Sequence, residues 1–201
     1  MGRSVPVAQP RSKNEIEEIA RKIIQHYQPE VLHKPAVFDI ERFFDCDLEP
    51  LTGVKPDYRE LPAGIHGYTD FEAMESVISK TLADDDSARR FCRSTIGHEV
   101  GHAGLHVRDF KRKWEAIRLI NNGEDVGLKL YRAQDIKAYL NPEWQAWRFC
   151  KSLLMPASVV SDAVRSGYSI KDLSDAFDLT PAFVKVRVKE LGFALQTISA
   201  L

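Results

Sequence analysis

The first regular pattern of apolar residues begins near Asn14, after which isoleucine and alanine recur at three- and four-residue spacing as far as Ile24. This spacing places the apolar side chains on one face of a helix, and Asn14 can serve as its N-cap. A second, shorter helix is predicted over residues 37–44. Residues 1–13 contain two prolines and a glycine without periodicity, so we expect them to form a flexible tail.

Between residues 48 and 82 the pattern changes to short apolar runs separated by glycine and proline, which favours the strands of a small sheet. The clearest strand candidates are AGIHGYTDF (63–71) and MESVISKTL (74–82). Acidic residues at 84–86 then precede a long helical pattern over 88–107, as suits the positive end of a helix dipole. We expect charged, irregular chain over residues 108–137.

The last third of the chain predicts further helices. Asn141 and Pro142 provide an N-cap and a first helical residue for a helix from Glu143 to Leu154. A proline at position 156 ends that helix. Shorter helices are predicted over residues 158–164, 170–177 and 181–191.

These elements predict an α+β fold, with a core of helices and a small twisted sheet over residues 14–156 and a helical subdomain over residues 157–201.

Lys and Arg number 28 and Asp and Glu number 29, so no general basic field exists to attract nucleic acid or an anionic membrane. Three cysteines without C-x-x-C spacing argue against a disulfide framework and a thiolate cluster. No stretch approaches the roughly 18 apolar residues of a membrane span, and no signal peptide is evident. We expect a soluble, cytoplasmic protein.

The segment His98-Glu99-Val100-Gly101-His102 is an H-E-x-x-H motif within the long predicted helix. Four residues advance a helix by about 6 Å and slightly more than one turn, so both imidazoles leave the same face and can bind one ion. Glu99 points beside that face, where a carboxylate can take a proton from a water molecule. The motif therefore predicts two metal ligands, His98 and His102, and a general base, Glu99.

A catalytic zinc ion needs a third protein ligand, and three alternatives can be compared. The metzincin extension of the motif is excluded, because Leu105 and Arg108 stand where it requires glycine and histidine. His106 would stand about 12 Å along an unbroken helix from His98, so an orienting, substrate-contacting or packing role suits it better than ligation. Glu143 begins a second helix and resembles the glutamate that gluzincins supply from a facing helix. We choose Glu143 as the third ligand.

Three segments resemble the ImmA/IrrE family of metallopeptidases. RRFCRSTIGHEVGHAGLH (89–106) is similar to that family's R-F-T-x-A-H-E-L-G-H-x-x-L-H helix, and YLNPEWQAWRFCKSLLMP (139–156) is similar to its P-E-W-Q-A-N-x-F-A-x-x-L-L-M-P segment. PAGIHGYTDFEAMESVIS (62–79) looks like the hairpin that precedes them. The resemblance extends over about residues 14–192.

The resemblance implies a zincin-like core that holds Zn²⁺ with His98, His102 and Glu143 and uses Glu99 in catalysis. It also implies a peptidase of the bacterial cytoplasm whose substrates are helix-turn-helix repressors of the Xre type. One departure is Trp147, which stands where the family usually has Asn or Asp, on the same helical face as Glu143. We therefore expect a polar group that orients a ligating histidine to be missing, at a cost in metal affinity or activity.

The C-terminal segment has the outline of a helix-turn-helix, with Thr180-Pro181 starting its second helix. Lys185, Arg187 and Lys189 lie on that helix, but residues 157–201 hold five basic and five acidic side chains, which cancel. We therefore expect a packing or protein-contact role and no strong nucleic-acid binding. Two alternatives to a peptidase stay open: a DNA-binding regulator, and an inactive interaction protein stabilised by its metal.

Several positions remain without an assigned role. Tyr68, His106 and Tyr131 can each donate a hydrogen bond to the oxyanion of a tetrahedral intermediate, and no spacing argument ranks them. Cys150 and Lys151 replace small residues of the family, a change that local repacking can explain.

Overall fold

A computed structural model describes residues 4–125 and 127–194 of the chain. The remaining ends of the expected tail and C-terminal subdomain, residues 1–3 and 195–201, lie outside the described residues. The fold is α+β and mostly helical, with two small sheets. This agrees with the predicted fold class at that level of detail.

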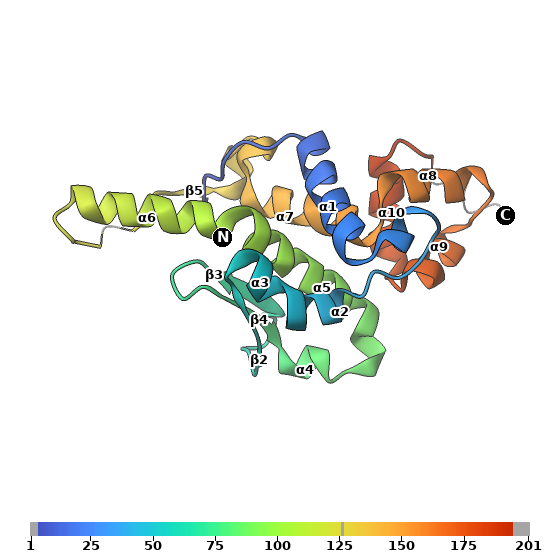
Figure 1. Ribbon diagram of the computed structural model, residues 1–201, viewed down its shortest axis with the longest axis horizontal. Helices are drawn as coiled ribbons and strands as arrows, with labels where there is room; N and C mark the ends of the chain where they lie inside the picture. Colours follow the sequence, from blue (N-terminus) through green and yellow to red (C-terminus); the bar gives the residue numbers. More distant parts are fainter. Residues whose placement is uncertain (1–3, 126, 195–201) are drawn as a thin grey trace.

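Two helices occupy the middle of the molecule, α5 (Arg89–His102) and α7 (Pro142–Leu154). They pack against each other, and α1 (Lys13–Tyr27) packs against α7 (Figure 1). The buried apolar residues of these helices form one cluster with those of the C-terminal helices. Helices α5 and α7 therefore have their positions fixed by contacts on several sides.

The starts of these helices follow from their capping residues. Asn141 is the N-cap of α7, as predicted, and its side chain accepts hydrogen bonds from the first turn. Helix α1 starts two residues earlier than an Asn14 cap would place it, at Lys13, because Ser12 and Glu15 form a capping box. The proposal of Asn14 as N-cap is therefore wrong by two residues.

A three-stranded sheet lies beside α5. It contains β2 (Lys55–Arg59), β3 (Gly67–Asp70) and β4 (Glu75–Ser79) in the order β2-β4-β3. Strand β4 runs parallel to β2 and antiparallel to β3, with Tyr68 opposite Val77. Strands β3 and β4 fall within the two predicted runs. The order makes β3 an edge strand, and β3 contacts α5.

Part of the expected flexible tail is ordered. Strand β1 (Ser4–Pro6) pairs antiparallel with β5 (Leu130–Arg132), and Val5 and Ala8 are buried. The backbone N–H of Ala8 donates to Leu140 O, which ties this segment to the chain just before α7. Burial of apolar side chains and backbone pairing both oppose disorder, so the prediction was wrong for residues 4–12.

The charged segment after α5 is also more regular than expected. It continues through a π-helical turn (Ala103–Val107) into α6 (Arg108–Ile120), which projects from the body at the end opposite to the C-terminal helices (Figure 1). Phe110 is the buried residue of α6, and Phe110, Trp114 and Ile117 recur at helical spacing among its charged side chains. The prediction of irregular chain was therefore wrong for residues 108–120.

Three C-terminal helices match their predicted positions: α8 (Ala157–Arg165), α9 (Ile170–Phe177) and α10 (Pro181–Glu190). Arg187 of α10 is fully buried and donates to the Glu17 carboxylate of α1 at 2.7 and 3.0 Å. These helices are therefore joined to the core by an internal ion pair as well as by apolar contacts.

Short helical segments connect the larger elements. The predicted helix over residues 37–44 is in fact split between a short α-helix and a π-helical turn. The segments are a 3₁₀ turn (Pro29–Leu32), α2 (Ile40–Arg42), the π-helical turn (Phe43–Asp47), α3 (Leu48–Thr52), α4 (Lys80–Ala83) and 3₁₀ turns at Asp86–Ala88, Ala133–Asp135 and Ala138–Leu140. Within the described ranges, no helix is both long enough and apolar enough to cross a membrane.

Candidate metal centre

The structure brings His98, His102 and Glu143 together. The two Nε2 atoms of His98 and His102 lie 3.1 Å apart, and the Glu143 carboxylate oxygens lie 3.5 Å from His98 Nε2 and 3.4 Å from His102 Nε2. Ligands about 2.0–2.1 Å from a tetrahedral ion are about 3.3 Å from one another. The three donors therefore fit a single metal ion, and their ligand atoms all lie within 4.8 Å of one another.

Small residues explain why the two ligand-bearing helices approach so closely. A Cβ atom on Gly101 would lie 2.9 Å from Ala146 O, and one on Gly97 would lie 2.8 Å from Cys150 Sγ. Gly97 and Gly101 are one turn apart on α5, and Ala146 and Cys150 are one turn apart on α7. The helices therefore cross on two glycines that flank His98, and this crossing places Glu143 opposite the histidines.

A chain of hydrogen bonds selects the tautomer of the neutral His102 ring. The Gln145 amide nitrogen donates to the backbone oxygens of Gln9 and Tyr139, so its oxygen faces His106 Nε2 at 3.1 Å. His106 Nε2 must then carry the proton, which makes His106 Nδ1 the acceptor for His102 Nδ1 at 3.2 Å. His102 consequently has its proton on Nδ1 and a lone pair on Nε2, the atom that faces Glu143.

His98 is supported differently. Its ring lies against the Trp147 indole, with centroids 4.2 Å apart and planes at 31°, and its buried Nδ1 atom has no hydrogen-bond partner among the described residues. The sequence predicts that a polar orienting group is missing at position 147, and the unpartnered Nδ1 agrees with that expectation. Trp147 restrains the imidazole by packing, and it leaves Nδ1 unsatisfied.

Burial also favours the neutral form of His98 and of His106. Burial lowers the pKa of His98 below its usual value, although the nearby Glu143 carboxylate opposes this effect. Burial lowers the pKa of His106 well below its usual value, and the neighbouring His102 adds to this. Neutral imidazole is the form that binds a metal ion.

Glu99 lies next to the triad but is not one of its three donors. The Thr69 hydroxyl of β3 donates to Glu99 Oε2 at 2.8 Å, and Ser76 contacts the same hydroxyl at 3.1 Å. Gly67 allows this approach, since a Cβ atom there would lie 3.1 Å from Glu99 Cγ. The edge of the sheet therefore holds the Glu99 carboxylate in place.

A cavity of about 480 Å³ opens beside the triad and includes Glu99, His98 and Glu143 in its wall. Of the three residues that can donate to an oxyanion, Tyr68 lines this cavity. His106 is buried and already bound to His102 and Gln145, which removes it from contact with substrate. Tyr131 lies on β5 and is not among the described lining residues.

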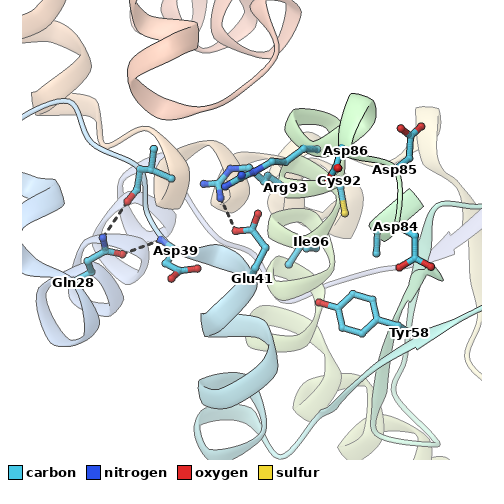
Figure 2. Close-up of a pocket in the computed structure, with 13 residues that line it drawn as sticks. Gln28, Asp39, Glu41, Tyr58, Asp84, Asp85, Asp86, Cys92, Arg93 and Ile96 are labelled. Carbon is cyan, nitrogen blue, oxygen red and sulfur yellow. Dashed lines mark hydrogen bonds and ion pairs between the residues drawn. The ribbon is translucent and has the colours of Figure 1, made fainter. Parts of the chain in front are cut away.

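A larger cavity of about 780 Å³ lies elsewhere, beside α2 and the start of α5 (Figure 2). Some of its polar groups are bonded to one another: Arg93 donates to Glu41 at 2.5 Å, and the Gln28 amide binds Val37 O and the backbone of Asp39. None of the triad residues is among its described lining residues. The smaller cavity is therefore the better candidate for chemistry, because the convergent donors are there.

Several supporting residues were not found from the sequence. Gly97 and Gly101 form a G-x-x-x-G pattern around His98, which is a signal for close helix packing, but the pattern does not reveal its partner. Gln145 and Thr69 act through tertiary contacts that no spacing predicts. Lys151 does more than repack locally, because it forms an ion pair with Glu190 of α10.

Comparisons with known proteins find no matching family model and no similar curated protein. Among solved structures, the chain is similar to a protein described as a "Mycobacterium tuberculosis transcriptional regulator", with a TM-score of 0.56 and 14% sequence identity. The likeness covers 88% of this chain and 48% of that chain, so this chain spans about half the length of its neighbour. At this level of identity the likeness concerns the fold alone.

Proposed function

We propose that this protein is a zinc-dependent endopeptidase in which His98, His102 and Glu143 hold the metal and Glu99 is the general base. The observation that carries the proposal is the convergence of two imidazole nitrogens and one carboxylate at 3.1 to 3.5 Å. Two His and one Glu are a frequent ligand set of catalytic zinc, which leaves a position for water or substrate. When bound, zinc would supply a Lewis acid that makes water acidic near neutral pH.

The other parts of the site would act on substrate and protons. Glu99 would take the proton of the attacking water and pass it to the leaving amine, while the Thr69 hydroxyl keeps the carboxylate oriented. Tyr68 lines the same cavity, and its hydroxyl would contact the oxyanion only by turning away from Glu75, to which it donates at 3.2 Å. An extended segment of substrate would pair with the free edge of β3, which runs beside Glu99.

The resemblance to the ImmA/IrrE family suggests the biological setting. We propose a zincin-like core that acts in the bacterial cytoplasm on an Xre-type helix-turn-helix repressor and relieves repression by cleaving it. Support comes from the sequence segments that resemble the family, since the ligands on two of them meet in space. The solved neighbour's description as a transcriptional regulator agrees with a role in transcription.

Glu99→Gln tests the mechanism directly, since it keeps the size of the side chain and removes its basicity. We expect this variant to bind zinc with wild-type stoichiometry and to leave a co-expressed helix-turn-helix repressor, encoded beside its gene, intact. His102→Ala should lose both zinc and cleavage. Cleavage by Glu99→Gln at the wild-type rate would exclude Glu99 as the base.

A DNA-binding regulator is the second candidate, because α9 and α10 have a helix-turn-helix outline and the solved neighbour is described as a regulator. Burial of Arg187 against Glu17 argues against it, since that guanidinium cannot reach a phosphate. Salt-sensitive binding of duplex DNA that requires residues 157–201 would favour the regulator. Zinc binding without cleavage of any repressor would favour the inactive interaction protein.

A further inference from the structure

We infer that the cavity beside the triad is a subsite for a bulky apolar or aromatic side chain of the peptide substrate, next to the bond that is cut. This inference rests on the proposed peptidase function and specifies its substrate class. It concerns the part of the cavity wall formed by Ile65, Phe91 and Trp147, which we call the apolar wall.

The apolar wall exposes large side chains where a folded protein gains nothing from exposing them. Ile65, Phe91 and Trp147 are 46%, 39% and 38% exposed, and they come from three separate segments of the chain. Single exposed apolar residues are ordinary on protein surfaces, but three that line one cavity indicate a binding site. Covering them with an apolar group removes their surface from water.

The wall is also fixed before any ligand arrives. The Phe91 ring meets the His66 ring edge to face, with centroids 4.9 Å apart and planes at 88°. The Trp147 indole packs on His98, which is itself at the metal centre. Binding would therefore order few side chains, and a group that touches Trp147 lies close to the reacting atoms.

The charges of the cavity select against polar side chains. Its charged lining residues, among those described, are Glu99 and Glu143, which the metal centre already uses. In the metal-free protein, an acidic substrate side chain would face these carboxylates without a cationic partner in the wall. The Thr95 hydroxyl is bonded to Phe91 O and the Tyr68 hydroxyl to Glu75, so neither is a free donor for a polar side chain.

The test is an NMR titration of the full-length, ¹⁵N-labelled protein with N-acetyl-phenylalaninamide, N-acetyl-alaninamide and N-acetyl-aspartamide, with zinc added and again after chelation. The indole signal of Trp147, one of three tryptophans, reports binding. We expect the phenylalanine probe to shift this signal and to bind roughly fivefold more tightly than the alanine probe, because it buries more apolar area. After chelation, when no metal ion can bind its carboxylate, the aspartate probe should be the weakest.

Two variants test whether the preference for the phenylalanine probe arises at the apolar wall. Phe91→Ser should remove most of the preference for phenylalanine, whereas Tyr168→Ser, at a residue that is 38% exposed and is not among those that line the cavity, should leave it unchanged. Equal affinity for the three probes, or a preference that survives Phe91→Ser, would overturn the inference. The titration is repeated without metal, so the two proposals can fail separately. A protein that does not bind zinc would refute the proposed peptidase function. The relative affinities of the three probes would still show whether the cavity prefers an apolar side chain.

Discussion

The Nδ1 atoms of His102 and His106 lie 3.2 Å apart, and this contact makes His106 a support for a ligand instead of a ligand itself. Its other nitrogen is bound to Gln145, whose amide is held by two backbone oxygens. This chain of hydrogen bonds from Gln145 through His106 to His102, which we call the relay, orients the ligating ring and sets its tautomer. The sequence leaves three roles open for His106, and the geometry selects the orienting one.

Replacing His106 with phenylalanine should therefore weaken metal binding while keeping the fold. The aromatic ring preserves packing on Phe110, with which His106 stacks at 5.7 Å, but it cannot accept the proton of His102 Nδ1. We expect zinc affinity to fall about 10- to 100-fold in competition with a chromophoric chelator. His33→Phe, at an exposed histidine, is the matched control. Unchanged affinity in His106→Phe would show that the relay is dispensable.

Gly101→Ala should disturb the helix crossing that assembles the site. The added Cβ would lie 2.9 Å from Ala146 O and 3.0 Å from Ala146 Cα, and backbone atoms cannot move aside cheaply. We expect a loss of about 1–3 kcal/mol in the free energy of unfolding, measured in urea, together with weaker zinc binding. Gly104→Ala is the control, because its Cβ would meet nothing within 4 Å. If Gly101→Ala and Gly104→Ala have the same stability and zinc affinity, the close crossing of α5 and α7 does not determine the assembly of the site.

The Glu17 carboxylate should make stability depend on pH. Burial raises the pKa of Glu17, but its ion pairs with Arg187 and Arg148 outweigh burial and hold the pKa below the usual 4.5. A lowered pKa in the folded state means that the stabilisation is complete above about pH 4.5 and is lost as the pH falls through the lower folded value.

Glu17→Gln should therefore cost about 3 kcal/mol at pH 7, because it leaves the buried Arg187 without its counter-charge. The difference from wild type should shrink below pH 4.5, as measured by urea unfolding at a series of pH values. Glu18→Gln, at an exposed residue paired with Arg21 on the same helix, should leave the unfolding curve unchanged. A Glu17→Gln effect that is the same at pH 3 and pH 7 would contradict this account.

Local signals in the sequence predicted a good part of the molecule. The Asn141-Pro142 pair fixes the start of α7 through its own hydrogen bonds, and the i, i+4 spacing of His98 and His102 fixes their common face. The C-terminal helices follow in the same way, because residues such as Ser169 and Thr180 cap them locally. Elements that depend on contacts between residues close in the sequence can therefore be predicted from one sequence.

What the sequence could not supply depends on contacts between distant segments. The crossing at Gly101 requires Ala146 opposite, and the parallel pairing of β2 with β4 requires knowledge of the sheet order. Helix α6 could have been predicted, since Phe110, Trp114 and Ile117 follow a helical spacing, but the many charged residues between them hid that short pattern. Strand β1 was missed because three residues paired with a remote strand leave almost no local pattern.

The central claim is that His98, His102 and Glu143 hold one zinc ion, and X-ray absorption at the zinc edge of the purified, zinc-loaded protein tests it most directly. We predict one zinc per chain, with two imidazole nitrogens and oxygen ligands at about 2.0–2.2 Å and no sulfur. Glu143→Gln should keep the imidazole signal and bind zinc more weakly. A spectrum that contains sulfur at about 2.3 Å, or a protein that binds no zinc, would contradict the account.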